Sequence, residues 1–96
     1  MHPLSRQFAD YCEGHFDLEH QVNYHYQFML AGDPNRVKPD VHIHHCIVDA
    51  CGRDVSNEEC QTLFTEAVEL LKPKHEGLTV AALDNTIWRF YSKASI

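Results

Sequence analysis

The sequence has few positive charges. Eight Lys and Arg stand against fourteen Asp and Glu in 96 residues, which gives a formal net charge of −6 with histidine neutral. Nonspecific nucleic-acid binding depends on Lys and Arg that neutralise phosphates, and no basic cluster exceeds the pair Lys72 and Lys74. We therefore expect no direct contact with nucleic acid, and the charge favours a basic protein as partner.

Long apolar runs and a secretory leader are also missing. No window approaches the roughly 18 apolar residues that a membrane span needs, and the first twelve residues lack a basic stretch followed by an apolar one. The sequence therefore predicts no membrane association and a cytoplasmic location. In that compartment we interpret the four cysteines as reduced thiols rather than two disulfides; they are Cys12, Cys46, Cys51 and Cys60.

Catalytic motifs are scarce too. The chain has no Gly-x-Ser-x-Gly sequence and no glycine-rich phosphate loop. Cys46, Cys51 and Cys60 fall on predicted core faces, where a thiol is usually inert. These absences favour a protein without enzymatic activity.

What the sequence does contain is helical periodicity in four segments, separated by short turns. At 96 residues and 44% hydrophobic content the chain suits one folded domain, residues 1–96. Because every segment is helical and the connections are short, the predicted fold class is all-α, a small antiparallel bundle of four to five helices.

The first segment, residues 4–30, carries an unbroken heptad seam. Its positions are Leu4, Phe8, Tyr11, His15, Leu18, Val22, His25 and Met29. The seam stays in phase across Gly14, which favours one long helix. Such a helix would be about 40 Å long, whereas a compact domain of this size is about 30–35 Å across. Either the helix breaks into a pair, or the molecule is elongated or dimeric.

The other three segments have clear ends. Residues 41–51 place apolar side chains on one face, after Pro39 and Asp40 and before a terminating Gly52. Residues 56–59 form a capping box for a helix that ends at Lys72 and Pro73. The last helix starts at Thr79 and carries its apolar stripe on Leu83, Ile87, Trp88 and Tyr91. Phe90 falls off this stripe, so we expect it to be exposed and available to a partner.

Histidine is the residue with the strongest chemical signal. On the second helix His42, His45 and Asp49 project together, and imidazole and carboxylate both suit zinc or iron. His15 and Glu19 have the spacing of a ligand pair from a facing helix. One hypothesis is therefore a metal or haem site drawn from His15, Glu19, His42, His44, His45 and Asp49. The alternative for the helical triplet is a solvated face.

Three histidines are expected to point inward: His15 and His25 from the seam, and His44 from the apolar arc of its helix. Buried imidazoles tend to stay neutral and to find hydrogen-bond partners. Their pKa would then be lowered, and stability would fall as the pH falls towards about 6. A second alternative function is thus a pH-responsive module.

The leading hypothesis is a non-enzymatic acidic helical protein that binds another protein, as a regulator, adaptor or inhibitor. It needs no cofactor, and it would form a homodimer through the seam. The predicted interface comprises Leu4, Phe8, Tyr11, Leu18, Val22, His25, Met29 and Phe90.

Overall fold

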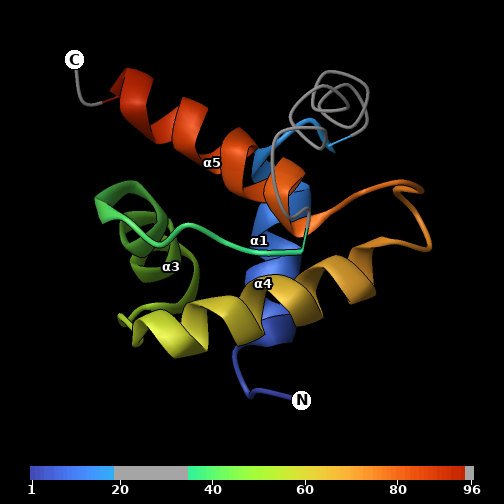
Figure 1. The fold of residues 1–96 in the computed structure, drawn as a ribbon, viewed down its shortest axis with the longest axis horizontal. Coiled ribbons are helices and arrows are strands. Elements are labelled where there is room, and N and C mark those ends of the chain that lie inside the picture. The colour runs from blue at the N-terminus through green and yellow to red at the C-terminus, as the bar shows by residue number, and fades with distance from the viewer. Residues whose placement is uncertain (19–34, 95–96) are drawn as a thin grey trace.

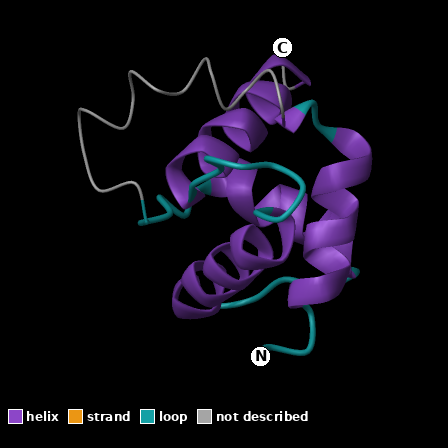
Figure 2. Ribbon diagram, turned by 90° about the vertical axis from the view of Figure 1, so that its right-hand side faces the viewer, coloured by secondary structure: helices purple, strands orange, loops and turns teal. Residues whose placement is uncertain are grey.

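The computed structural model describes residues 1–18 and 35–94 of the chain. These residues form four helices: α1 (Ser5–His15), α3 (Val41–Cys51), α4 (Asn57–Leu71) and α5 (Val80–Ala94) (Figure 1). Helices are the regular elements throughout residues 1–18 and 35–94, joined by loops and turns (Figure 2). The predicted all-α class and helical bundle are confirmed.

Helices α3 and α5 are neighbours that run in the same direction. Lys38 contacts Asp84, and His42 contacts Trp88, so α3 and α5 lie side by side and run the same way. Between them in sequence, α4 runs from left to right in Figure 1, and α5 returns above it towards the upper left. Helix α1 packs against α4, where the ring centroids of Phe8 and Phe64 are 5.0 Å apart.

The first helix ends at His15. The backbone of Phe16 is extended, with φ −125° and ψ 145°, and its N–H donates to the carbonyl of Cys12. Phe16 and Leu18 then place their side chains in the core. The favoured prediction of one continuous helix over residues 4–30 is therefore wrong: the break allows a molecule of 34 × 31 × 24 Å. Seam positions Val22, His25 and Met29 lie outside the described residues.

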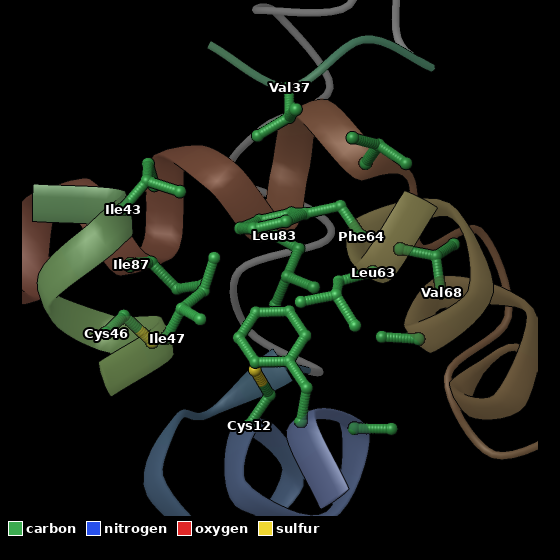
Figure 3. Packing of buried hydrophobic residues seen from close by; sticks show 14 of the residues in the cluster. Cys12, Val37, Ile43, Cys46, Ile47, Leu63, Phe64, Val68, Leu83 and Ile87 are labelled. Atoms are coloured by element: carbon green, nitrogen blue, oxygen red, sulfur yellow. The ribbon is translucent and has the colours of Figure 1, made fainter. Parts of the chain in front are cut away.

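All four helices contribute to one apolar core (Figure 3). Its largest fully buried side chains include Phe8 from α1, Ile43 and Ile47 from α3, Leu63 and Phe64 from α4, and Leu83 and Ile87 from α5. The predicted apolar faces of the last three helices are confirmed at these positions.

The ends of the helices follow local signals in the sequence. Asp40 accepts a hydrogen bond from the Ile43 N–H at 3.0 Å, and Gly52 ends α3 with a left-handed φ of 78°. Ser56 and Glu59 form the predicted capping box of α4. These caps fix both ends of α3 and the start of α4, because they satisfy backbone groups that a helix leaves open at its ends.

An extended strap, residues 35–39, crosses from α4 to α5. The amide of Gln61 accepts the Val37 N–H at 3.0 Å and donates to the Asn35 carbonyl at 2.8 Å. Asp84 accepts the Lys38 N–H at 2.7 Å. Side chains of both helices thus hold the strap just before α3 begins.

Candidate functional site

Helix α3 exposes apolar side chains that its own core face does not need. Val41 is 75% exposed and Val48 is 41% exposed, one on each side of the exposed His45. Trp88 of α5 is 44% exposed, and its ring meets the edge of His42 with centroids 5.9 Å apart. We name this group the α3–α5 surface; it comprises Val41, His42, His45, Val48 and Trp88. Apart from its histidines, α3 carries one Asp and no Glu, Lys or Arg; the Asp is Asp49.

A polar network fixes the helices beneath this surface. The Tyr91 hydroxyl donates to Asp49 Oδ2 at 2.8 Å, so its oxygen accepts the Tyr11 hydroxyl at 3.0 Å. Burial raises the pKa of Tyr91, and its hydrogen bonds to Tyr11 and Asp49 raise that pKa further. Burial also raises the pKa of Tyr11. Both phenols therefore remain protonated donors, and they tie α1, α3 and α5 together.

A second cluster lies on the opposite flank of α3, against α4. His44 Nδ1 is 2.7 Å from Asp54 Oδ1, and His44 Nε2 is 2.7 Å from Asn57 Oδ1. These two hydrogen bonds raise the pKa of His44, and the bond to His44 lowers the pKa of Asp54. The Cys60 sulfur lies 4.0 Å and 3.9 Å from the two ring nitrogens.

The grouping of Cys60, His44 and Asp54 is not arranged for nucleophilic catalysis. A catalytic histidine needs a free nitrogen to take the proton of the thiol. Both nitrogens of His44 face oxygen atoms, and burial raises the pKa of Cys60 to about 11. The thiol therefore remains protonated and packs against the imidazole ring.

The candidate metal ligands that the structure describes do not converge on one point. His42 contacts Trp88, His44 is held by Asp54 and Asn57, and the ring of His45 lies 4.9 Å from that of Tyr91. His45 Nε2 is also 3.7 Å from Asp49 Oδ2. Within residues 1–18 and 35–94, no three His, Cys, Asp or Glu residues form a group that could hold a metal ion. Glu19 lies outside the described residues.

The inward position predicted for His15 is wrong, and for His44 the predicted direction of the pKa shift is wrong. His15 is exposed: it stacks on the ring of Tyr11 at 3.9 Å, and its Nδ1 lies 3.0 Å from the Tyr11 carbonyl. The heptad spacing that placed His15 on an inward face does not apply, because α1 ends at this residue. His44 is half-buried, but its acidic partner raises its pKa instead of lowering it. His25 lies outside the described residues.

The predicted interface also needs correction. Phe8 and Leu18 are fully buried in the chain's own core, so they are not available to a second protein. Leu4 and Tyr11 are partly buried and pack against that core. Phe90 is 48% exposed, as predicted. Trp88 was expected in the core, but it lies at the edge of the α5 stripe, where the buried Ile87 and Tyr91 already fill the interior.

A family model matches residues 17–92, which is most of the chain. The chain belongs to the family described as Domain of unknown function (DUF8548). The DUF8548 match spans α3, α4 and most of α5, and it begins after α1. No curated protein and no solved structure matches the chain. None of the described helices of this DUF8548 chain is long and apolar enough to cross a membrane.

Sequence reasoning missed part of what the DUF8548 fold brings together. Val41 and Val48 are seven residues apart, so they lie on the same side of a helix, two turns from each other. This spacing could have predicted the exposed apolar face of α3. Asp54 and Asn57 follow His44 by ten and thirteen residues across a turn. No helical period connects them, so only the geometry of the turn shows the cluster.

Proposed function

We propose that this DUF8548 chain is a non-enzymatic module that binds a basic protein partner on the α3–α5 surface. The observation that supports it most is the exposure of Val41, Val48 and Trp88 on neighbouring helices. Contiguous apolar side chains on the surface of a soluble domain mark interaction sites more often than scattered ones do. An exposed Trp is also the side chain most enriched among residues that dominate binding energy.

Charge favours a basic partner. The chain carries a formal charge of −6, and two carboxylates belong to this side of α3: Asp40 at its start and Asp49 on it. Asp54, on the opposite flank, is paired with His44. Arg53 is the one cation of the turn that follows α3, and its guanidinium is directed at the Asp54 carbonyl. An apolar centre with an acidic rim would attract cations at the edge of the partner's surface.

The surface is also held in place before binding. Asp49 accepts a hydrogen bond from the Tyr91 hydroxyl, and Tyr91 accepts one from the Tyr11 hydroxyl. These bonds hold α3 and α5 against α1. A pre-organised surface loses less conformational entropy on association, which supports a binding role.

The test is a quantitative comparison of captured proteins. The immobilised chain, a Val48→Glu variant, a Trp88→Ser variant and a Phe90→Ser control are exposed to the same extract, and retained proteins are measured by mass spectrometry. We expect a basic protein that both surface variants lose about tenfold or more, that the control retains, and that added salt weakens.

Equal retention by all four proteins would refute the proposal, as would loss in the Phe90→Ser control to the same degree. Sedimentation of each protein alone checks the remaining possibility. If the two surface variants abolish a dimer of the unmodified chain, the occupant is a second copy, and the basic partner is rejected.

A further inference from the structure

His44 joins two elements through both of its ring nitrogens. Nδ1 lies 2.7 Å from Asp54 Oδ1 in the turn after α3, and Nε2 lies 2.7 Å from Asn57 Oδ1 in the first turn of α4. Both partner atoms are oxygens that accept hydrogen bonds. A neutral imidazole carries one N–H, so it can donate to only one of them. With Asn57 Oδ1 turned towards Nε2, the arrangement is that of the imidazolium form, in which both nitrogens donate.

We propose that His44 is a proton-operated latch, which ties α3 to the first turn of α4 when it is protonated and releases that turn when it loses a proton. The inference is independent of the proposed partner, because it concerns contacts within the chain. It differs from the sequence hypothesis in sign, since the proton closes the contact rather than disrupting it.

The groups around the ring determine which proton leaves. Asp54 is a carboxylate that also accepts the Val55 N–H at 2.8 Å, and it favours a proton on Nδ1. Asp40, at the start of α3, adds a weaker attraction for the charged ring. Cys60 from α4 stays a neutral thiol, because burial raises its pKa to about 11. Asn57 is uncharged, so the Nε2 proton that faces it is the one lost.

The release acts on a groove beside the strap. Asn57 lines this open groove of about 430 Å³ together with strap residues and further α4 side chains: Asn35, Arg36, Val37, Pro39, Glu58 and Gln61. When Nε2 becomes a lone pair, the Asn57 oxygen that faces it is repelled. The latch opens because the Asn57 amide moves away, and the hydrogen-bonding groups along the groove change with it. An amide that only turned over would donate from its NH₂ group to Nε2 and keep α3 tied to α4.

The experiment follows the ring and the backbone of the intact chain by nuclear magnetic resonance. The His44 signals are titrated from pH 5 to 9, and amide exchange is measured over residues 52–60. We expect a midpoint above the ordinary histidine value of 6.5. Above that midpoint, exchange should quicken by about threefold to tenfold beyond intrinsic base catalysis, the loss of about one hydrogen bond.

Two variants with opposite expected shifts make the test specific. Asp54→Asn keeps an acceptor but removes the charge, so the His44 midpoint should fall. Asn57→Asp adds a second carboxylate, so the midpoint should rise. Both positions are on the surface, so folding should survive both changes. Asp10→Asn, at an exposed position of α1, is the control and should leave the His44 midpoint unchanged.

The latch is rejected if His44 titrates at or below 6.5, or if the two variants move its midpoint in the same direction. It is also rejected if exchange over residues 52–60 keeps its intrinsic pH dependence through the midpoint.

Discussion

At the scale of single residues, Asp84 has the most buried carboxylate within residues 1–18 and 35–92. It is 8% exposed, it accepts the Lys38 N–H, and burial raises its pKa from 3.8 to about 6. The folded state therefore binds this proton more tightly than the unfolded state does. Its contribution to stability is largest below pH 4 and is lost as the pH rises through 6.

Replacing Asp84 by Asn should remove this pH dependence. The amide keeps an acceptor for the Lys38 N–H but carries no buried charge. At pH 8 the variant should be more stable than the unmodified chain by on the order of 1–3 kcal/mol, and near pH 4 the difference should vanish. Urea unfolding at both pH values measures it. Asp10→Asn, at an exposed position of α1, is the control; a gain that is the same at both pH values would contradict the explanation.

At the scale of elements, two glycines at helix ends differ in their backbone conformation. Gly14 lies within α1, has open space where a Cβ would stand and has no left-handed φ. Gly52 ends α3 with a φ of 78°, a conformation that L residues rarely adopt. The same substitution should therefore have opposite effects on the two helices.

We expect Gly14→Ala to raise the free energy of unfolding by about 0.5–1 kcal/mol, because alanine restricts the unfolded chain and suits a helix. Gly52→Ala should lower it by about 1 kcal/mol or more, because the residue would be strained. Thermal and urea unfolding of the two variants decide the matter. Two changes of the same sign would mean that the helix end at Gly52 rearranges.

Sequence patterns predicted what is local in these elements. The helix ends at Asp40, Gly52 and Ser56 could be predicted because each capping residue and the backbone group it satisfies lie within three or four residues. The apolar faces of α3, α4 and α5 were readable from periodicity. The end of α1 was not, because Phe16 leaves the helix to reach a core that other helices supply. His44 was misjudged for a related reason: its partners lie beyond the turn after its own helix.

At the scale of the whole molecule, stability should rise as the solution becomes mildly acidic. The pKa values of Asp84 and His44 are both raised, so both groups stabilise the folded state more as the pH falls from 8. Asp54, Glu59 and Glu66 have lowered pKa values, and their contribution is lost only when the pH falls below their ordinary values near 4.

The melting temperature should therefore increase between pH 8 and pH 5.5, by about 4 °C or more if the combined gain reaches about 1 kcal/mol. Calorimetry in buffers of constant ionic strength measures it. The sequence hypothesis of buried neutral histidines gives the opposite slope, so a melting temperature that falls over this range would restore it.

The region that matches the DUF8548 family is shorter than the folded domain, because it leaves out α1. The match begins at residue 17, yet α1 inserts Phe8 against Phe64, and it is fastened by Ser5 to Glu66 and by Glu13 to His75. Trimming a protein to its family boundary is a common way to choose a fragment for expression. A fragment of residues 17–96 would leave Phe64 facing water, at a cost of about 3–5 kcal/mol for the missing ring alone. A fragment of this chain should keep His2 as well as α1, because His2 forms hydrogen bonds with Glu59 and Glu66 of α4.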